Sequence, residues 1–74
     1  MPNHYVTFGQ DHVHKVNGKV LHSNVVAVFQ VENAVEGRKK AFELFGSKFS
    51  FEYPQDSWKE EDINYYPGGY VYLD

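Results

Sequence analysis

Apolar and polar positions along the chain predict three strands. Residues 25–31 form a nearly continuous apolar run, which is typical of a central strand covered on at least one face. Residues 4–8 alternate polar and apolar side chains and predict a second strand. Residues 49–53 alternate polar side chains with Phe49, Phe51 and Tyr53, so they predict a third strand with one aromatic face, ended by Pro54.

The segment at residues 33–45 predicts one amphipathic helix. Asn33 is a favourable N-cap, and Glu36 three residues later completes a pattern that resembles a capping box. Gly46 stands where a C′ glycine ends a helix. Gly37 costs about 1 kcal/mol of helix stability relative to Ala, so we expect it to permit a close approach of helix to sheet. The predicted buried face consists of Ala34, Gly37, Ala41, Leu44 and Phe45.

Residues 9–24 are polar and contain Asn17-Gly18, a strong signal for a two-residue β-hairpin turn. The segment is therefore either a short β-arm at residues 12–22 or a long mobile loop.

The C-terminal third contains two weaker signals. Ser57 and Glu60 resemble a second capping box, so residues 57–62 are expected to form a single helical turn. Residues 63–66 and 70–73 flank a Pro-Gly-Gly turn at residues 67–69. They form either a terminal aromatic hairpin or one strand preceded by a turn.

These elements predict a single α+β domain over residues 1–74. Its sheet is small, antiparallel or mixed, with the order β-β-α-β-β and the extra arm at 12–22, and the one helix (about 33–45) packs on one face. The other face must then be polar, be shielded by residues 9–24, or be buried against a second molecule.

The amino-acid composition indicates which interactions stabilise the fold. The 74 residues contain no Cys, so neither a disulfide nor a thiolate metal site can support so small a fold. Six Phe, six Tyr and one Trp are the expected source of the core. Residues 1–14 have neither a basic start nor an apolar run, so we expect no signal peptide and a cytoplasmic location.

Charge is distributed unevenly along the chain. The net charge is −3, but residues 52–74 hold six acidic residues and one Lys, which gives −5. This acidic half argues against contact with phosphate backbones. The one basic cluster, Arg38-Lys39-Lys40, is expected to be a solvated helix face. We expect neither a nucleic-acid nor a membrane partner.

The histidines offer one candidate metal site. His12 and His14 would project to one side of a strand, and with Asp11, His4 or His22 they could supply three ligands for zinc or a similar ion. The alternative is that these histidines are exposed or hydrogen-bonded loop residues.

Catalytic patterns are weak. The serines lack an elbow or triad-like setting, and the turn at residues 67–69 lacks the following helix and Lys of a phosphate-binding loop. The adjacent acids Glu60, Glu61 and Asp62 are expected to be solvated rather than catalytic. The protein is therefore not expected to be an enzyme or to hold a cofactor.

The C-terminal aromatic residues provide the leading candidate site. There are more aromatic rings here than one face of a short hairpin can bury. The acidic residues beside them would suit a basic partner. The alternative is that these rings belong to the core. The predicted partner-binding set is Trp58, Glu60, Glu61, Asp62, Tyr65, Tyr66, Tyr70 and Tyr72.

Several segments together resemble small bacteriophage and prophage proteins of unassigned function: residues 7–14, Asn17-Gly18-Lys19, residues 25–28, residues 36–46, and the turn at residues 65–69. The resemblance implies an accessory protein without catalytic residues. Phage proteins of this size often bind and disable a host protein, including defence proteins such as CRISPR effectors. We therefore expect a protein-binding function in the host cytoplasm. The alternatives are a metal-binding module that uses His12 and His14, and a structural subunit that self-associates as a homodimer through its uncovered sheet face.

Overall fold

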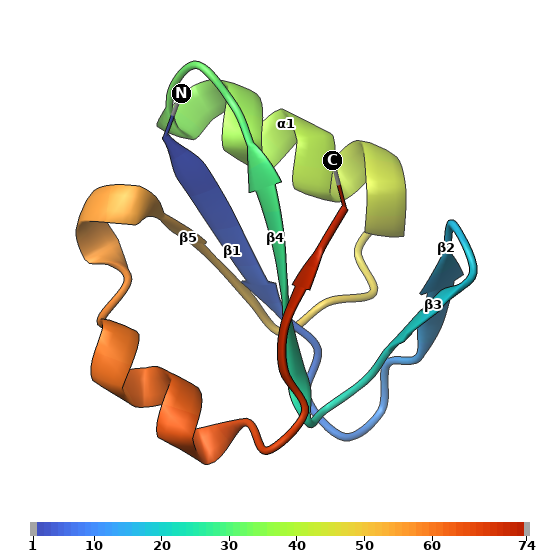
Figure 1. Ribbon diagram of the computed structural model, residues 1–74. Helices are drawn as coiled ribbons and strands as arrows, with labels where there is room; N and C mark the ends of the chain where they lie inside the picture. Colours follow the sequence, from blue (N-terminus) through green and yellow to red (C-terminus); the bar gives the residue numbers. More distant parts are fainter. Residues whose placement is uncertain (1, 74) are drawn as a thin grey trace.

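A computed structural model describes residues 2–73, and it shows a four-stranded mixed sheet with one α-helix and a separate β-hairpin (Figure 1). The strand order is β5 (Phe51–Pro54), β1 (Asn3–Thr7), β4 (Val25–Gln30), β6 (Gly69–Tyr72). Strand β1 is antiparallel to both of its neighbours, whereas β6 runs parallel to β4. The predicted α+β fold with the order β-β-α-β-β is confirmed, and the sheet is mixed.

Helix α1 (Ala34–Phe45) begins and ends where the capping signals predict. The Asn33 side chain accepts a hydrogen bond from the Glu36 backbone N–H at 2.9 Å, and the Gly46 N–H donates to the Phe42 carbonyl at 2.8 Å. Gly37, Ala41 and Phe45 are buried as predicted, whereas Ala34 is exposed. Within residues 2–73, no helix is both long and apolar enough to cross a membrane.

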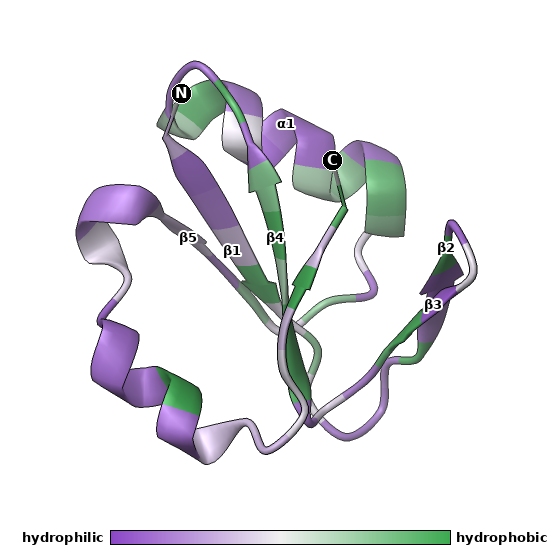
Figure 2. Cartoon of the chain, viewed as in Figure 1, coloured by the Kyte–Doolittle hydropathy of each residue, from purple (hydrophilic) through white to green (hydrophobic). Residues whose placement is uncertain are grey.

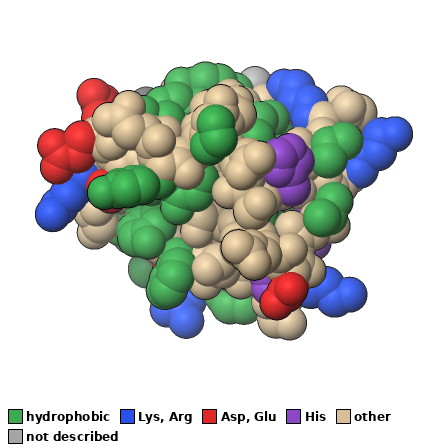
Figure 3. Space-filling model, turned by 90° about the horizontal axis from the view of Figure 1, so that it is seen from below, with side chains coloured by type: hydrophobic (Ala, Val, Ile, Leu, Met, Phe, Trp, Pro, Cys, Tyr) green, Lys and Arg blue, Asp and Glu red, His purple; other side chains and the backbone are tan. Residues whose placement is uncertain are grey.

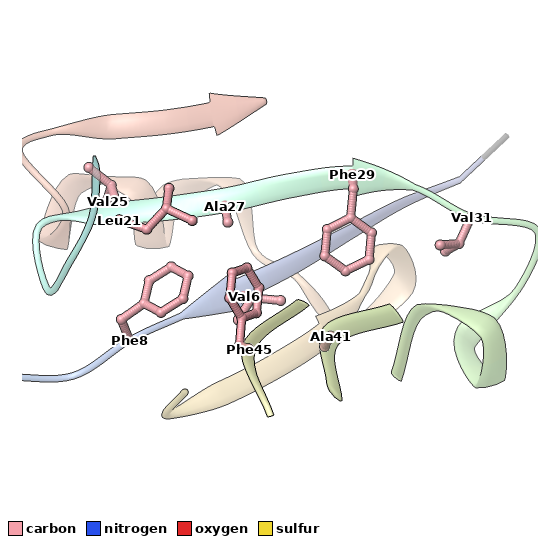
Figure 4. Packing of buried hydrophobic residues seen from close by; sticks show 9 residues of the cluster. All are labelled: Val6, Phe8, Leu21, Val25, Ala27, Phe29, Val31, Ala41 and Phe45. Carbon is pink, nitrogen blue, oxygen red and sulfur yellow. The ribbon is translucent and has the colours of Figure 1, made fainter. Parts of the chain in front are cut away.

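The main core lies between α1 and one face of the sheet. Because side chains alternate along a strand, β1 and β4 each present every second residue to the helix. Figure 4 shows these side chains with Ala41 and Phe45 of α1 among them. The buried cluster consists of Val6, Phe8, Leu21, Val25, Ala27, Phe29, Val31, Ala41 and Phe45.

The arm is a β-hairpin formed by β2 (His14–Val16) and β3 (Lys19–Leu21), so the first alternative for residues 12–22 is confirmed. Asn17 and Gly18 have φ angles of 52° and 78°, and positive values at both positions are typical of a type I′ turn. Leu21 is fully buried in the main core, so the hairpin closes one end of the space beneath α1.

The opposite face of the sheet is apolar and is covered by the chain itself, so none of the three expectations for this face is right. Two 3₁₀ helices, η1 (Gln55–Ser57) and η2 (Glu60–Tyr65), cross it in place of one turn at residues 57–62. Figure 2 shows η2 as mainly hydrophilic apart from a hydrophobic band. A second buried cluster of Tyr5, Val26, Val28 and Trp58 lies here, packed against Tyr53, Ile63, Tyr66 and Tyr70.

Two further expectations need correction. Strand β5 starts at Phe51 and includes Pro54, whereas a strand over residues 49–53 was expected. Phe49 lies outside the strand and packs edge-on against Phe42 of the helix, with ring centroids 5.2 Å apart, so residues 49–53 do not share one aromatic face. Residues 63–65 belong to η2, which rules out the terminal hairpin and confirms the alternative of one strand preceded by a turn. The physical reason is that β6 runs in the same direction as β5, and parallel strands need a crossover rather than a tight turn.

Candidate protein-binding surfaces

Trp58, predicted to bind a partner, is a core residue instead. Its side chain is 9% exposed and stacks on Tyr5 with ring centroids 5.0 Å apart and planes 12° from parallel. Its indole N–H donates a hydrogen bond to the Tyr70 hydroxyl at 3.0 Å. A buried indole needs such a polar partner, and this one ties the crossover to β6.

The rest of the predicted partner-binding set divides into packed and exposed residues. Tyr66 and Tyr70 are half-buried, each with its ring centroid 6.3 Å from that of Trp58. Tyr65 and Tyr72 are 78% and 57% exposed. Figure 3 shows the molecule from below, with hydrophobic side chains interspersed among other side chains over its middle and both acidic and basic side chains around its rim. Of the acidic residues in the set, Glu60 and Glu61 are exposed and Asp62 is half-buried.

Tyr53 belongs to this aromatic layer, with its ring centroid 5.5 Å from that of Trp58. Burial raises the pKa of the Tyr53 phenol, and the nearby Tyr66 and Asp62 raise it further by opposing a phenolate charge. The folded state therefore holds this proton more tightly than the unfolded chain, whose tyrosines titrate at about pH 10.

This raised pKa gives a pH-dependent prediction. The stabilisation is fully present below about pH 10 and is lost as the pH rises through the higher folded-state value. We expect the Tyr53→Phe variant to lose less unfolding free energy than wild type between pH 8 and pH 11, measured by urea denaturation. Tyr65→Phe, which alters an exposed ring, should follow wild type. Identical pH profiles for wild type and Tyr53→Phe would contradict the prediction.

The histidines do not converge on a metal site. His12 lies in the loop before β2, and the His14 Nε2 lies 2.5 Å from the Lys48 carbonyl, with the ring packed between Phe8 and Phe45. The His22 Nδ1 accepts a hydrogen bond from the Asn24 backbone N–H at 3.2 Å. Among residues 2–73, no three His, Asp or Glu side chains lie close enough together to hold a metal ion.

His4 has a separate, structural environment. Its Nε2 lies 2.5 Å from a Glu52 carboxylate oxygen, and its ring is fully buried and stacked on Phe29 with centroids 5.6 Å apart. A Cβ added to Gly37 would come within 2.2 Å of its Nδ1, so the ring lies directly beneath the helix backbone. The predicted close approach at Gly37 is confirmed.

The largest exposed apolar side chains near the helix form a surface that sequence reasoning missed. Val35, Phe42 and Phe51 are 69%, 45% and 63% exposed. A hollow of about 380 Å³ lies over Val35 and Phe42, and a groove of about 200 Å³ follows between α1 and β5. We call this the α1–β5 surface, and it consists of Val35, Arg38, Lys39, Phe42, Glu43, Phe49, Ser50, Phe51 and Glu52.

A sequence signal for this surface exists. Val35 and Phe42 are seven residues apart and therefore lie above one another on the helix, outside the face predicted to be buried. An apolar pair of this kind, outside the buried face of the helix, is the sequence signal for exposed apolar side chains on α1.

The basic run within α1 does not form a patch of three unengaged charges. The Arg38 guanidinium lies 5.8 Å from the Phe42 ring centroid, and the Lys40 ammonium lies 5.0 Å from that of Phe29. Lys39 is 3.9 Å from the Glu36 carboxylate. Each side chain thus contacts a different neighbour, and only Arg38 borders the groove beside β5.

Comparison of the chain with protein-family models, with curated proteins and with solved structures found no match.

Proposed function

We propose that this protein acts by binding another protein and that it catalyses no reaction. The observation that carries the proposal is the α1–β5 surface, where Val35, Phe42 and Phe51 remain exposed although the chain has two packed cores. Phe42 lies beside Arg38, and aromatic residues and Arg are among the residue types that contribute most to binding energy at protein interfaces.

The buried pair of His4 and Glu52 supports a non-enzymatic function. In the described part of the chain, this is the one ion pair between a His and a carboxylate. The His4 side chain is 1% exposed and lies beneath α1, so its ring cannot reach a substrate.

The resemblance to bacteriophage and prophage proteins suggests the kind of partner. We propose that it is a bacterial host protein, including defence proteins of the CRISPR type, and that binding disables it. The small size and the paucity of catalytic motifs fit an accessory protein of this kind.

An affinity pull-down from bacterial lysate, read by mass spectrometry, tests the proposal. The tagged wild type is compared with Phe42→Ser/Phe51→Ser and with the matched control Tyr65→Ser/Tyr72→Ser, each first shown to be folded by circular dichroism. We expect wild type and the control to retain one host protein and the Phe42/Phe51 variant to lose it. Capture of nothing by wild type would contradict protein binding, and loss only in the Tyr65/Tyr72 variant would move the site to the C-terminal aromatic residues.

A plaque-efficiency assay tests the identity of the partner. Expression of the protein should raise phage plating only in hosts that carry the affected defence system. Equal plating in hosts with and without such systems would contradict the anti-defence part of the proposal.

A further inference from the structure

The two edges of the sheet are protected differently. On the β6 side the hairpin lies nearby, and the Lys19 ammonium donates a hydrogen bond to the Tyr72 carbonyl, so a charged side chain occupies this edge. Strand β5 has only β1 as a partner, and no other described strand pairs with its outer side (Figure 1). An edge strand without a neighbour on its outer side is a template for pairing with another extended segment. In β5 this template is four residues long and ends at Pro54, which has no backbone N–H to donate.

Side chains on both faces of the sheet flank the open edge at β5. Phe51 lies opposite Thr7 in the ladder, so its side chain leaves the strand toward the face covered by η1 and η2. At this edge it is 63% exposed, and it also borders the groove beside α1. On the helix face the groove of about 200 Å³ runs beside the strand, with Phe42 and Arg38 along its other side. A strand added to β5 would thus meet an apolar ring on one face and an Arg on the other.

The groove is lined by one basic and one acidic side chain, Arg38 and Glu52, and only Glu52 has an ion-pair partner among the described residues. Arg38 stacks on Phe42 and makes no ion pair within residues 2–73. Glu52, the acidic residue that also lines the groove, is occupied by His4. Acidic side chains on a partner would therefore find an unpaired guanidinium, which binds carboxylates with directed hydrogen bonds.

Building on the proposed function, we propose that the partner adds an extended segment to β5 as a fifth strand, with apolar and acidic residues in alternation. Alternation is required because successive side chains of a strand point to opposite faces. The apolar residues pack on Phe51, and the acidic residues face Arg38 across the groove.

A second copy of the chain fits this edge less well. Two-fold pairing of β5 with β5 would place both helices on the same face of one continuous sheet, with the two Arg38 side chains approaching each other. Like charges brought together in this way oppose pairing. The guanidinium of Arg38, which has no ion-pair partner within residues 2–73, thus favours an acidic strand over a second β5.

The first test uses a fluorescein-labelled octapeptide that alternates Val and Glu, with a Val/Lys octapeptide as the matched control. We expect the Val/Glu peptide to bind in fluorescence anisotropy at low salt, and the Val/Lys peptide to bind at least tenfold more weakly. Replacing one central residue of the Val/Glu peptide by Pro removes a backbone donor and should abolish binding. In NMR spectra of ¹⁵N-labelled protein, the largest chemical-shift changes on addition of the Val/Glu peptide should fall on residues 50–53 and on Arg38.

Protein variants locate the site independently. Arg38→Glu and Phe51→Ser should each lower the affinity for the Val/Glu peptide at least tenfold. Lys15→Glu makes the same charge change on the exposed hairpin and should leave this affinity unchanged. Equal affinity for the Val/Glu and Val/Lys peptides, or shifts confined to η2, would overturn the proposal. A dimer in sedimentation that Phe51→Ser dissolves would overturn it in favour of self-pairing.

The outcome can be separated from that of the proposed function. If the host protein retained in the pull-down depends on Phe42 and Phe51 but is not displaced by excess Val/Glu peptide, strand addition is wrong and protein binding stands. If the peptide binds at β5 but no host protein is captured, the edge site stands and the proposed function falls.

Discussion

Phe45→Ala is expected to lower the free energy of unfolding by about 3–5 kcal/mol. The ring is 3% exposed and joins three parts of the fold. It packs edge-on against Phe8 of the sheet side, with centroids 5.0 Å apart, and contacts His14 of the hairpin at the same centroid distance. Natural domains are stable by only about 0.05–0.15 kcal/mol per residue, so a loss of this size should leave much of a 74-residue chain unfolded.

Phe42→Ala provides the matched control, because it removes the same ring from the same helix at a position that is 45% exposed. Urea denaturation followed by tryptophan fluorescence should show a clearly smaller loss for Phe42→Ala than for Phe45→Ala. Equal losses, or a Phe45→Ala protein with unchanged melting, would mean that the helix does not pack on the sheet through this face.

The elements predicted correctly from the sequence are those encoded by neighbouring residues. The caps at Asn33 and Gly46 bound the helix, and Asn17-Gly18 specifies the hairpin turn, because each signal acts over only a few residues. The buried strand β4 follows in the same way from its unbroken apolar run. Such local signals do not depend on where the rest of the chain lies.

The elements missed depend on contacts between distant residues. Residues 57–66 are mostly polar and acidic, so their sequence does not predict that they cover a face of the sheet. They do so because Trp58 stacks on Tyr5, which lies 53 positions earlier in the chain. For the same reason β6 could not be assigned to its parallel place beside β4. Parallel pairing carries no local turn signal, since its connection crosses a whole face of the sheet.

The predicted partner-binding set divides into rings that pack in the core and rings that stay exposed, among them Tyr65 and Tyr72. Trp58, Tyr66 and Tyr70 were selected because Tyr and Trp are common at interfaces, yet the same rings suit a core when a polar partner is present, as Tyr70 is for Trp58. Whether an aromatic ring is exposed depends on what the completed fold leaves uncovered. That is why Phe42 and Phe51, rather than the C-terminal rings, form the α1–β5 surface.

Gly37→Ala is the second substitution expected to change the free energy of unfolding strongly. The sign of the change shows whether the gain in helix propensity or the clash with His4 is larger. In an unconstrained helix the change would stabilise by about 1 kcal/mol, because Ala is the better helix former. Here the new Cβ would lie 2.2 Å from Nδ1 and 2.5 Å from Cγ of the His4 ring, far inside van der Waals contact. His4 is fully buried, stacked on Phe29 and in contact with Glu52, so moving the ring away from the new Cβ would disrupt both contacts. We expect a net loss of up to about 2 kcal/mol, measured by urea denaturation, since overpacking of this kind typically costs about 1–3 kcal/mol and the helix gain offsets about 1 kcal/mol of it.

Removing the ring should reverse the sign of this effect. In a His4→Ala/Glu52→Gln background, which deletes the ring and neutralises its carboxylate partner, Gly37→Ala should become neutral or stabilising, because only the helix propensity remains. If this background is too unstable on its own, the same cycle can be measured in trimethylamine N-oxide, which strengthens folding without touching the site. A loss that persists without the ring would show that the helix backbone, rather than His4, limits the space at Gly37. A stabilising Gly37→Ala in the wild-type background would show that the helix does not lie on His4 at all.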